Sequence, residues 1–371
     1  MARIIISGGG TGGHIFPAIS IANALKEIDE KIEILFVGAE GKIEMEKVPA
    51  AGYKIIGLPV AGFQRRFTFK NVTFFYKLIK SMWKARSVVK EFKPDVAVGV
   101  GGYASGPVLK VASGRGVPTL LQEQNSFAGV TNRLLAKKAA KICVAYENMQ
   151  RFFPAEKIIM TGNPVRKDLN FSQRNDLEAL RQEGLSHFGL DAKKKIVLVV
   201  GGSLGARTLN ESMIDGMQKL ASDSSIQVIW QTGKLYIEEI QKKTVGLNVE
   251  NIKIMQFVNR MDLAYAVADV VISRAGAGTI SELCVTAKPC ILVPSPNVSE
   301  DHQTQNALAL VNQSAAILVK DTEAKEKLID EVMKLIHNSN LLEKMKQNIV
   351  ALAKPDAAKQ IANEILKLIQ K

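Results

Sequence analysis

The chain has 371 residues, of which 47% are hydrophobic and 23% are charged, and its net charge is +13. This length exceeds one ordinary core and the apolar content suffices for folding, so we expect two domains and exclude a largely disordered protein. The positive excess predicts an anionic partner, which could be nucleic acid, a membrane surface or a phosphate-rich substrate.

The first residues predict neither a signal peptide nor a membrane anchor. Met1, Ala2 and Arg3 precede a run of only three isoleucines, and a glycine-rich loop follows at once. No stretch approaches the roughly 20 apolar residues that a membrane-spanning helix needs, so we expect a cytoplasmic protein. The three cysteines, at positions 143, 284 and 290, lack metal-ligand spacing and are predicted to be buried free thiols.

Short β-branched runs alternate with helix-length segments along the whole chain. In the first half we predict strands at residues 4–7, 32–37, 95–100, 119–122, 142–145 and 158–161. In the second half we predict strands at residues 196–200, 226–231, 252–257, 270–273, 290–293 and 316–319. Most runs are apolar throughout, which is typical of parallel strands buried on both faces. The alternation predicts an α/β protein with two doubly wound parallel sheets and a ligand site in the cleft between the domains.

The first glycine-rich loop, residues 8–13, matches the spacing GxGxxG. Such glycines allow a tight turn and close backbone approach to a ligand. A dinucleotide-binding domain would also need an acid at the end of the second strand, and Glu40 is poorly placed for this. His14 follows the loop at a helix start, where a neutral imidazole is favoured and could accept a proton from a hydroxyl group. A purely structural role for His14 is the alternative.

Three polar segments of the second half predict a nucleotide-sugar site. Residues 201–207 form another glycine-rich loop, in which Ser203 adds a hydroxyl donor. Residues 273–282 run from a strand end through small residues into a helix, so backbone amides could hold a diphosphate and Glu282 a ribose diol. Residues 301–306 bring amide and hydroxyl groups that suit sugar hydroxyls. Glycine-rich turns and helix capping are the alternative explanations.

Six motifs together resemble one enzyme family. Residues 8–17, 122–125, 162–166, 201–207, 277–282 and 301–307 have the order and approximate spacing of the MurG-type enzymes of peptidoglycan synthesis, in glycosyltransferase family 28. The resemblance covers essentially the whole chain and departs at Gln122, where many relatives carry histidine. It implies a GT-B fold, with two Rossmann-like domains facing across a cleft, and no metal or other cofactor. The implied reaction is inverting transfer of N-acetylglucosamine (GlcNAc) from UDP-GlcNAc to the muramyl sugar of undecaprenyl-pyrophosphoryl-MurNAc-pentapeptide (lipid I), giving lipid II.

The resemblance also implies roles for the domains and for the partners. Residues 1–163 would bind the acceptor and the membrane, residues 164–350 would bind UDP-GlcNAc, and a helix within residues 351–371 would return to the N-terminal domain. UDP-GlcNAc, lipid I and an anionic membrane surface are the implied partners, with other cell-wall synthesis proteins as further candidates. The protein would then be peripheral, on the cytoplasmic face of the cell membrane.

An inverting transfer needs a base for the acceptor hydroxyl and stabilisation of the leaving diphosphate. His14 is the candidate base, with Glu123 as a weaker alternative, and Arg166 acts with the helix N-termini on the diphosphate. By analogy, Val258 offers backbone groups to the uracil, and Asn125 contacts the sugar. The residues implied at the UDP-GlcNAc site are Thr11, Gly12, Gly13, Asn125, Arg166, Ser203, Val258, Ala277, Gly278, Thr279, Ile280, Ser281, Glu282 and Gln303.

Residues 63–93 carry much of the positive charge, with nine Lys or Arg side chains and one acid, a net of +8. Eight of the 22 aromatic residues lie in the same stretch. Apolar and basic side chains at helical spacing are typical of an interfacial membrane anchor, whereas packing into the first domain is the alternative. No nucleic-acid motif accompanies the cluster, which disfavours nucleic acid as the partner. The predicted docking residues are Phe67, Phe75, Ile79, Trp83, Lys77, Lys80 and Lys84.

Three other functions stay open at this stage. A different GT-B transferase could move a UDP-sugar to another lipid, for example diacylglycerol. A UDP-GlcNAc epimerase can share the architecture and would need no lipid acceptor. A nicotinamide-dependent or purely nucleotide-binding protein would use only the GxGxxG loop, and the motifs of the second half disfavour it.

Overall fold

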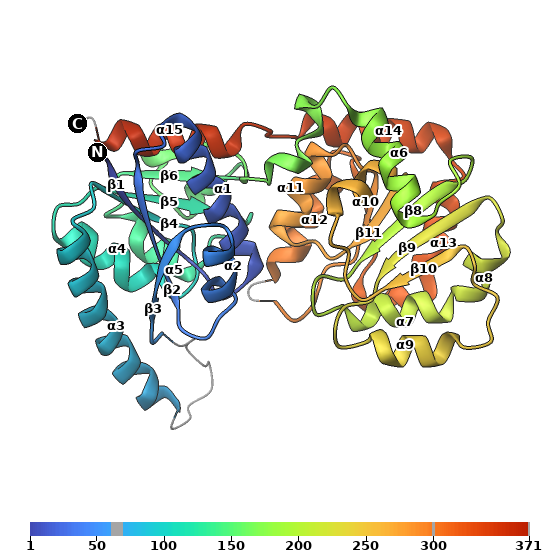
Figure 1. The fold of residues 1–371 in the computed structure, drawn as a ribbon, viewed down its shortest axis with the longest axis horizontal. Coiled ribbons are helices and arrows are strands. Elements are labelled where there is room, and N and C mark those ends of the chain that lie inside the picture. Colours follow the sequence, from blue (N-terminus) through green and yellow to red (C-terminus); the bar gives the residue numbers. More distant parts are fainter. Residues whose placement is uncertain (61–69, 299–300, 370–371) are drawn as a thin grey trace. The chain divides into compact units, whose positions relative to one another are not determined.

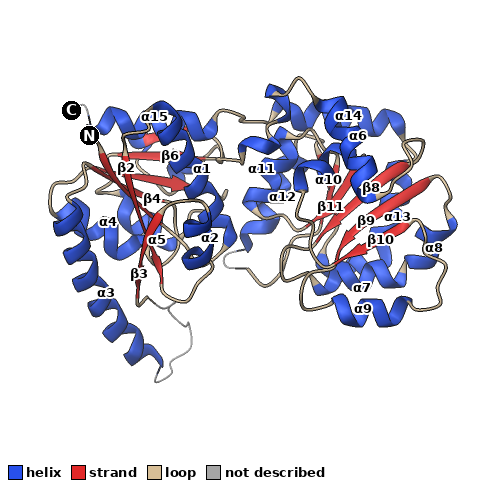
Figure 2. Ribbon diagram, viewed as in Figure 1, coloured by secondary structure: helices blue, strands red, loops and turns tan. Residues whose placement is uncertain are grey.

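The computed structural model describes residues 1–60, 70–298 and 301–369, and it describes side chains from residue 76 onward within the helix that begins at residue 70. The chain divides into two compact units, Met1–Arg166 with Lys354–Lys371, and Lys167–Ala353. Each unit is a parallel sheet with helices on both faces (Figures 1 and 2). This confirms the predicted α/β class with two doubly wound sheets.

The sheet of the first unit has seven parallel strands in the order β3-β2-β1-β4-β5-β6-β7. The strand order reverses between β1 and β4: β2 and β3 lie on one side of this pair, and β5 to β7 lie on the other. The carboxyl ends of β1 and β4 therefore flank the switch point at which such sheets bind ligands. The strands are β1 (Arg3–Ser7), β2 (Glu33–Ala39), β3 (Lys54–Leu58), β4 (Val96–Gly99), β5 (Thr119–Glu123), β6 (Lys141–Val144) and β7 (Ile158–Met160). The α-helices are α1 (Gly12–Ile28), α2 (Glu44–Ala50), α3 (Lys70–Phe92), α4 (Ser105–Gly114), α5 (Val130–Ala136) and α15 (Ala357–Ile369).

The sheet of the second unit repeats this plan with six parallel strands in the order β10-β9-β8-β11-β12-β13. Its switch point lies between β8 and β11. The strands are β8 (Lys195–Val200), β9 (Ile226–Gln231), β10 (Ile252–Met255), β11 (Val270–Ser273), β12 (Cys290–Leu292) and β13 (Ala316–Leu318). The α-helices are α6 (Leu177–Phe188), α7 (Arg207–Asp215), α8 (Met217–Ser222), α9 (Ile237–Thr244), α10 (Met261–Val267), α11 (Ala277–Val285), α12 (His302–Val311), α13 (Ala324–Ile336) and α14 (Ser339–Ala351).

The continuous apolar runs are explained by burial on both sides of each sheet. In β1, Ile4 and Ile6 pack with α1 and α15, whereas Ile5 packs on the opposite face with α3, α4 and α5. All three isoleucines are completely buried, and full burial of such a side chain stabilises the fold by roughly 1.5–3 kcal/mol. The three cysteines are also buried and unpaired, as the sequence predicted.

The edge strand β3 is the strand that the sequence patterns missed. Its residues Lys54, Ile55 and Ile56 are exposed or half-buried, and Gly57 interrupts the apolar run. It pairs only along β2, from Leu35↔Lys54 to Ala39↔Leu58. An edge strand needs neither a fully apolar run nor strict alternation, so this segment carried a weak signal.

The last helix, α15, belongs to the first unit although it follows the second unit in the chain. It lies beside α1 and β4, and Ile361, Ala362 and Ile365 complete the core on that face of the sheet (Figure 1). At the chain crossing nearby, Gly162 has φ +84°, and a Cβ there would lie 2.3 Å from the Cβ of Lys354. Glycine therefore allows the segment that follows β7 to pass directly against the segment that leads into α15.

In the described part of the chain, no helix combines the length and apolarity needed to cross a membrane.

Truncating a core residue of α15 should destabilise the first unit selectively. We expect Ile361→Ala to lower the free energy of unfolding of that unit by about 2–5 kcal/mol, because it leaves a cavity beside β1 and β4. Hydrogen exchange of the β1 and β4 amides measures this change. Trp230, buried in the second unit, should keep its fluorescence transition. The exposed Lys359→Ala on the same helix is the control, and equal effects of both substitutions would contradict the assignment.

Candidate functional site

A polar pocket of about 720 Å³ lies at the carboxyl ends of β8 and β11 in the second unit. Three segments singled out in the sequence line it together: the loop after β8, the start of α11 and the start of α12. α7 and α11 both begin at this pocket, and helix N-termini with exposed amides favour anionic ligands. Lining residues include Gly201, Gly202, Arg207, Gly276, Thr279 and Gln303.

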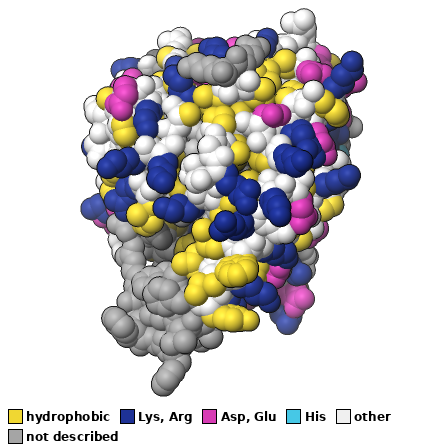
Figure 3. Space-filling model, turned by 90° about the vertical axis from the view of Figure 1, so that its left-hand side faces the viewer, with side chains coloured by type: hydrophobic (Ala, Val, Ile, Leu, Met, Phe, Trp, Pro, Cys, Tyr) yellow, Lys and Arg dark blue, Asp and Glu magenta, His cyan; other side chains and the backbone are white. Residues whose placement is uncertain are grey.

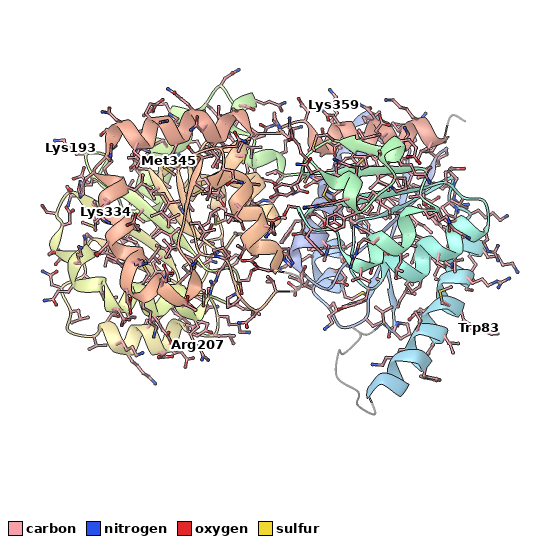
Figure 4. The ribbon with its side chains drawn as sticks, turned by 180° about the vertical axis from the view of Figure 1, so that it is seen from behind. Trp83, Lys193, Arg207, Lys334, Met345 and Lys359 are labelled. Carbon is pink, nitrogen blue, oxygen red and sulfur yellow. The ribbon has the colours of Figure 1, made fainter. Side chains whose placement is uncertain are left out.

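Two arginines line the pocket, and they differ in their partners. Arg274 donates through Nη1 to two backbone carbonyl groups after β12, at 3.0 and 3.2 Å, and pairs closely with Asp321. Asp321 in turn accepts a hydrogen bond from Thr208 Oγ1 at 3.0 Å. Arg207 starts α7 and is exposed (Figure 4). The network fixes Arg274 in the wall, whereas Arg207 lines the pocket with an exposed side chain.

The start of α11 presents backbone more than side chains. The Thr279 side chain belongs to the pocket wall, but those of Ala277 and Ile280 are buried in the unit. Ser281 Oγ donates to the carbonyl oxygen of Ala277 at 2.9 Å, within the helix. Ala277, Gly278 and Thr279 can therefore meet a ligand through their amides, whereas the amide of Ile280 donates to the carbonyl of Gly276 at 2.9 Å. The side-chain hydroxyl at this turn belongs to Thr279.

Glu282 lies one turn further along α11, outside the residues that line the pocket. Its Oε2 accepts a hydrogen bond of 3.0 Å from the hydroxyl of Tyr265, which is buried. This bond orients the carboxylate of Glu282. On α12, Gln303 is oriented in the same way, because its Oε1 accepts from the backbone amide of Ser295 at 2.8 Å.

The backbone of Val258 differs from the sequence expectation in one respect. Its N–H donates to Oε1 of buried Gln231 at 2.9 Å, and Gln231 Nε2 donates to the carbonyl of Gly202 at 3.1 Å. The amide of Val258 is thus already used within the unit, so the expected uracil contact cannot use that N–H. Ser203 is exposed and lies outside the pocket lining.

In the first unit, the glycine loop joins β1 to α1 and presents His14 from the first turn of that helix. Thr11 Oγ1 lies 3.2 Å from His14 Nδ1. On the other side of the ring is Gly101, with φ +87°, where a Cβ would approach His14 Nε2 to 2.9 Å. His14 is therefore held between Thr11 and the turn after β4, and it is half-buried. Gly12 and Gly13 lie beside it at the helix start.

Glu123 is a structural carboxylate in this arrangement. Its Oε1 accepts from the amide of Asn125 at 3.1 Å, and its Oε2 accepts from the amide of Gly129 at 3.0 Å and from Asn132 Nδ2 at 2.9 Å. Burial raises the pKa of the Glu123 carboxyl, and these hydrogen bonds oppose the rise. Because both oxygens hold the loop after β5, we do not retain Glu123 as an alternative base.

Buried side-chain amides join the loop after β5 to the segment that follows β7. Gln122 Nε2 donates to Asn163 Oδ1 at 3.0 Å, and Asn163 Nδ2 donates to the carbonyl of Gln124 at 2.9 Å. Gln124 also donates to Gln122 and, at 2.8 Å, to the carbonyl of Val100. The network fixes the segment that ends at the half-buried Arg166, so the glutamine that replaces the family's histidine has a packing role of its own.

The outer side of α3 is apolar and basic. Ile79 and Trp83 are 60% and 76% exposed, and Lys77 and Lys80 are exposed beside them. Trp83 projects from the helix in Figure 4, and Figure 3 shows hydrophobic side chains gathered there next to Lys and Arg. Lys84 pairs with Glu40 at 2.9 Å, so its charge is partly compensated. Phe67 and the side chain of Phe75 lie outside the described residues.

The opposite side of α3 packs into the core of the first unit through Ala85, Val88 and Val89. The helix thus divides into a buried face and an exposed apolar face. The alternative in which the aromatic face packs inward does not apply to Trp83.

Comparisons with known proteins agree with this architecture. Residues 4–144 match the N-terminal domain model of glycosyltransferase family 28, and residues 196–361 match the C-terminal domain model of the same family. The solved structure of MurG from Acinetobacter baumannii is 27% identical, with a TM-score of 0.77, and the match covers 99% of this chain and 100% of that one. This confirms the expected GT-B fold.

The fold alone is shared more widely. A putative UDP-N-acetylglucosamine 2-epimerase from Listeria monocytogenes has a TM-score of 0.70 at 15% identity, over 98% of this chain and 96% of that one.

A relative from Bacteroides fragilis is 57% identical over 99% of this chain and 96% of its own length. It is named UDP-N-acetylglucosamine–N-acetylmuramyl-(pentapeptide) pyrophosphoryl-undecaprenol N-acetylglucosamine transferase. On this near full-length identity, the chain belongs to the MurG-type enzymes of glycosyltransferase family 28.

Proposed function

We propose that this protein transfers GlcNAc from UDP-GlcNAc to the muramyl sugar of lipid I, which gives lipid II for peptidoglycan synthesis. The observation that carries the proposal is the 57% identity, over nearly the whole chain, to a relative named for this reaction. The pocket of the second unit supports it, since glycine-rich helix starts and an exposed arginine suit the diphosphate of a nucleotide sugar.

The second unit holds the donor in this proposal. The amides at the start of α11 and the Arg207 side chain take the diphosphate, and Glu282 takes the ribose hydroxyls. Val258 meets the uracil through its carbonyl group, because its N–H is bound to Gln231. Thr279 and Gln303 line the pocket and contact the sugar-phosphate part of the donor.

The first unit supplies the base. His14 takes the proton of the attacking acceptor hydroxyl as the oxygen bonds to the anomeric carbon of GlcNAc and the bond to the UDP oxygen breaks. UDP leaves as the diphosphate anion, and the configuration at the anomeric carbon inverts. Arg166 and the amides of Gly12 and Gly13 add positive potential, and Asn125, held by Glu123, contacts the sugar.

The rival functions fit less well. An epimerase of the same architecture would need no apolar surface, yet α3 exposes Ile79 and Trp83. A transferase that acts on a different lipid would have the same donor pocket. Assays with different lipid acceptors distinguish it from the proposed enzyme. The test of the whole proposal is UDP release from UDP-GlcNAc with and without a short-chain lipid I analogue. Release that needs the analogue, with a product heavier by one GlcNAc, supports it, and release without acceptor contradicts it.

We also propose that α3 docks the protein on the anionic cytoplasmic face of the membrane. Ile79 and Trp83 would enter the acyl boundary while Lys77 and Lys80 meet the headgroups. Docking would bring the acceptor-binding unit to the lipid-anchored substrate. Partnership with other cell-wall synthesis proteins is a further proposal that follows from this location.

Replacing His14 with alanine should lower kcat by about 10²–10⁴-fold, because the acceptor hydroxyl loses its proton acceptor. The affinity for UDP should change less than about threefold, because His14 is not among the residues that line the pocket proposed for the UDP part of the donor. Steady-state kinetics and calorimetric titration with UDP measure the two quantities. His187→Ala, an exposed histidine on α6, is the matched control. An unchanged kcat in His14→Ala would remove His14 from the mechanism.

Replacing Glu282 with glutamine should abolish discrimination between UDP and 2′,3′-dideoxy-UDP. We expect the wild type to bind UDP about 10-fold more tightly than the dideoxy analogue, since hydrogen bonds to a charged group contribute about 1.5–3 kcal/mol. The variant should bind both with similar, weaker affinity. The control is Glu326→Gln on α13, which makes the same substitution at an exposed glutamate of the same unit. Discrimination that persists in Glu282→Gln would place the ribose elsewhere.

Reversing two charges on α3 should weaken membrane binding. Each cation near an anionic surface contributes on the order of 1 kcal/mol, so Lys77→Glu with Lys80→Glu should lower the partition coefficient on phosphatidylglycerol vesicles at least about 10-fold. Added salt should weaken the wild type in the same direction. Liposome flotation measures the bound fraction, with exposed Lys359→Glu as the control. Binding that is indifferent to both salt and charge reversal would contradict docking through α3.

A further inference from the structure

A fully buried carboxylate lies next to the glycine loop of the first unit. Glu44 is the first residue of α2 and has no exposed surface. Burying an acidic side chain is costly unless hydrogen-bond donors surround its oxygens. The position of this carboxylate therefore calls for an explanation.

Both oxygens of Glu44 are used to hold the backbone. The amide of Gly10 lies 3.1 Å from Oε1 and 3.0 Å from Oε2, and the amide of Ala39, the last residue of β2, donates to Oε1 at 2.9 Å. Glu44 thus joins the middle of the loop after β1 to the end of β2. Amides that donate to a carboxylate form stronger hydrogen bonds than those that donate to neutral acceptors.

Two glycines make room for this carboxylate. A Cβ at Gly9, where φ is +147°, would lie 2.0 Å from Glu44 Oε1. A Cβ at Gly38 in β2 would lie 2.6 Å from Glu44 Cγ. The absence of side chains at these two positions is therefore tied to Glu44, and not only to the approach of a ligand.

The other side of the loop is closed by the turn after β4. A Cβ at Gly102 would lie 2.2 Å from the carbonyl oxygen of Gly9, and one at Gly101 would lie 2.8 Å from His14 Cδ2. The loop is enclosed between Glu44 and this turn, and His14 follows it after Thr11, Gly12 and Gly13. The path of the loop decides where the imidazole is placed against Gly101.

This use of an acid differs from that in a dinucleotide-binding domain of the same topology. There, an acidic side chain near the end of the second strand binds a ribose hydroxyl. Here Glu40, which directly follows β2, pairs with Lys84 at 2.9 Å. Glu44, five residues beyond β2, turns inward, and its oxygens accept from the amides of Gly10 and Ala39. The first unit therefore keeps the GxGxxG spacing without offering this carboxylate to a nucleotide.

We propose that Glu44 is a positioning residue for the transfer reaction, which fixes the glycine loop and through it the placement of His14. Glu44 acts through the backbone, because its carboxylate accepts hydrogen bonds from loop and strand amides. The kinetic part of this inference rests on the proposed function. Misplacing a catalytic group by about 1 Å can lower the rate about 100-fold, so a small shift of the loop suffices.

The test compares Glu44→Gln with Glu46→Gln, an exposed glutamate on the same helix. Glutamine keeps the shape but has one acceptor oxygen and an NH₂ group, which would face the N–H of Gly10. We expect kcat to fall by about 10–100-fold in Glu44→Gln, with the affinity for UDP unchanged within about twofold. Amide exchange within residues 8–14 should quicken about 10-fold or more. Glu46→Gln should match the wild type in all three measurements.

A spectroscopic readout separates this inference from the transfer assay. The chain has four histidines, so the imidazole signals can be resolved by NMR. Glu44→Gln should shift the His14 ring signals and leave those of His187, His302 and His337 in place. If the wild type failed to transfer GlcNAc, the proposed function would fall, whereas the shift of the His14 signals would still support positioning by Glu44.

Gly38→Ala provides a second variant, because its methyl group would press on Glu44 Cγ without removing the carboxylate. It should produce the same shift of His14 and a similar loss of kcat. Unchanged His14 signals in both variants would overturn the inference. So would a joint loss of kcat and UDP affinity, or the unfolding of both variants, since either would show that Glu44 stabilises the protein generally.

Discussion

Burial of both faces of a parallel sheet is the constraint on which the rest of this structure depends. Once helices cover both faces, the interior of a strand such as β1, from Ile4 to Ser7, has no exposed side chains left with which to bind a ligand. Only the loops at the strand ends remain, and helix N-termini point to the carboxyl ends. The binding and catalytic groups of each unit are therefore confined to the carboxyl ends of its strands, at the point where the strand order reverses.

The two units use that edge differently. In the second unit the loop after β8 lies open, with Arg207 and the amides of α11 directed to a pocket that suits a diphosphate. In the first unit the corresponding loop is closed from behind by Glu44 and from the front by Gly101 and Gly102. What it presents is the imidazole of His14. In our proposal one topology thus yields an anion site in the second unit and a base in the first, because different side chains reach the same kind of loop.

Most of the fold followed from the sequence because buried parallel strands leave a strong pattern. The strand β3 did not, since an edge strand is half-exposed and lacks that pattern. The loops of the pocket were also found, because glycine at strand ends marks close backbone approach. What could not be found were the contacts of single polar groups. Gln231, Asp321 and Glu44 bind residues far away in the chain, and the role of each side chain appears only when the fold brings its partners to it.

Glu123 is a case in which the sequence pattern indicates a catalytic role and the structure shows a structural one. The sequence marks it as an acid in a polar run after a strand, which is where a catalytic base is often found. Hydrogen bonds from Asn125, Gly129 and Asn132 instead make it the anchor of its own loop. Glu44 does the same for the loop after β1. Each of the two loops that carry candidate sugar-binding or catalytic residues in the first unit is therefore held by one inward-facing carboxylate. Such loops can expose Asn125 or His14 to a ligand while their backbones stay fixed, which is the preorganisation that a transfer between two bound sugars requires.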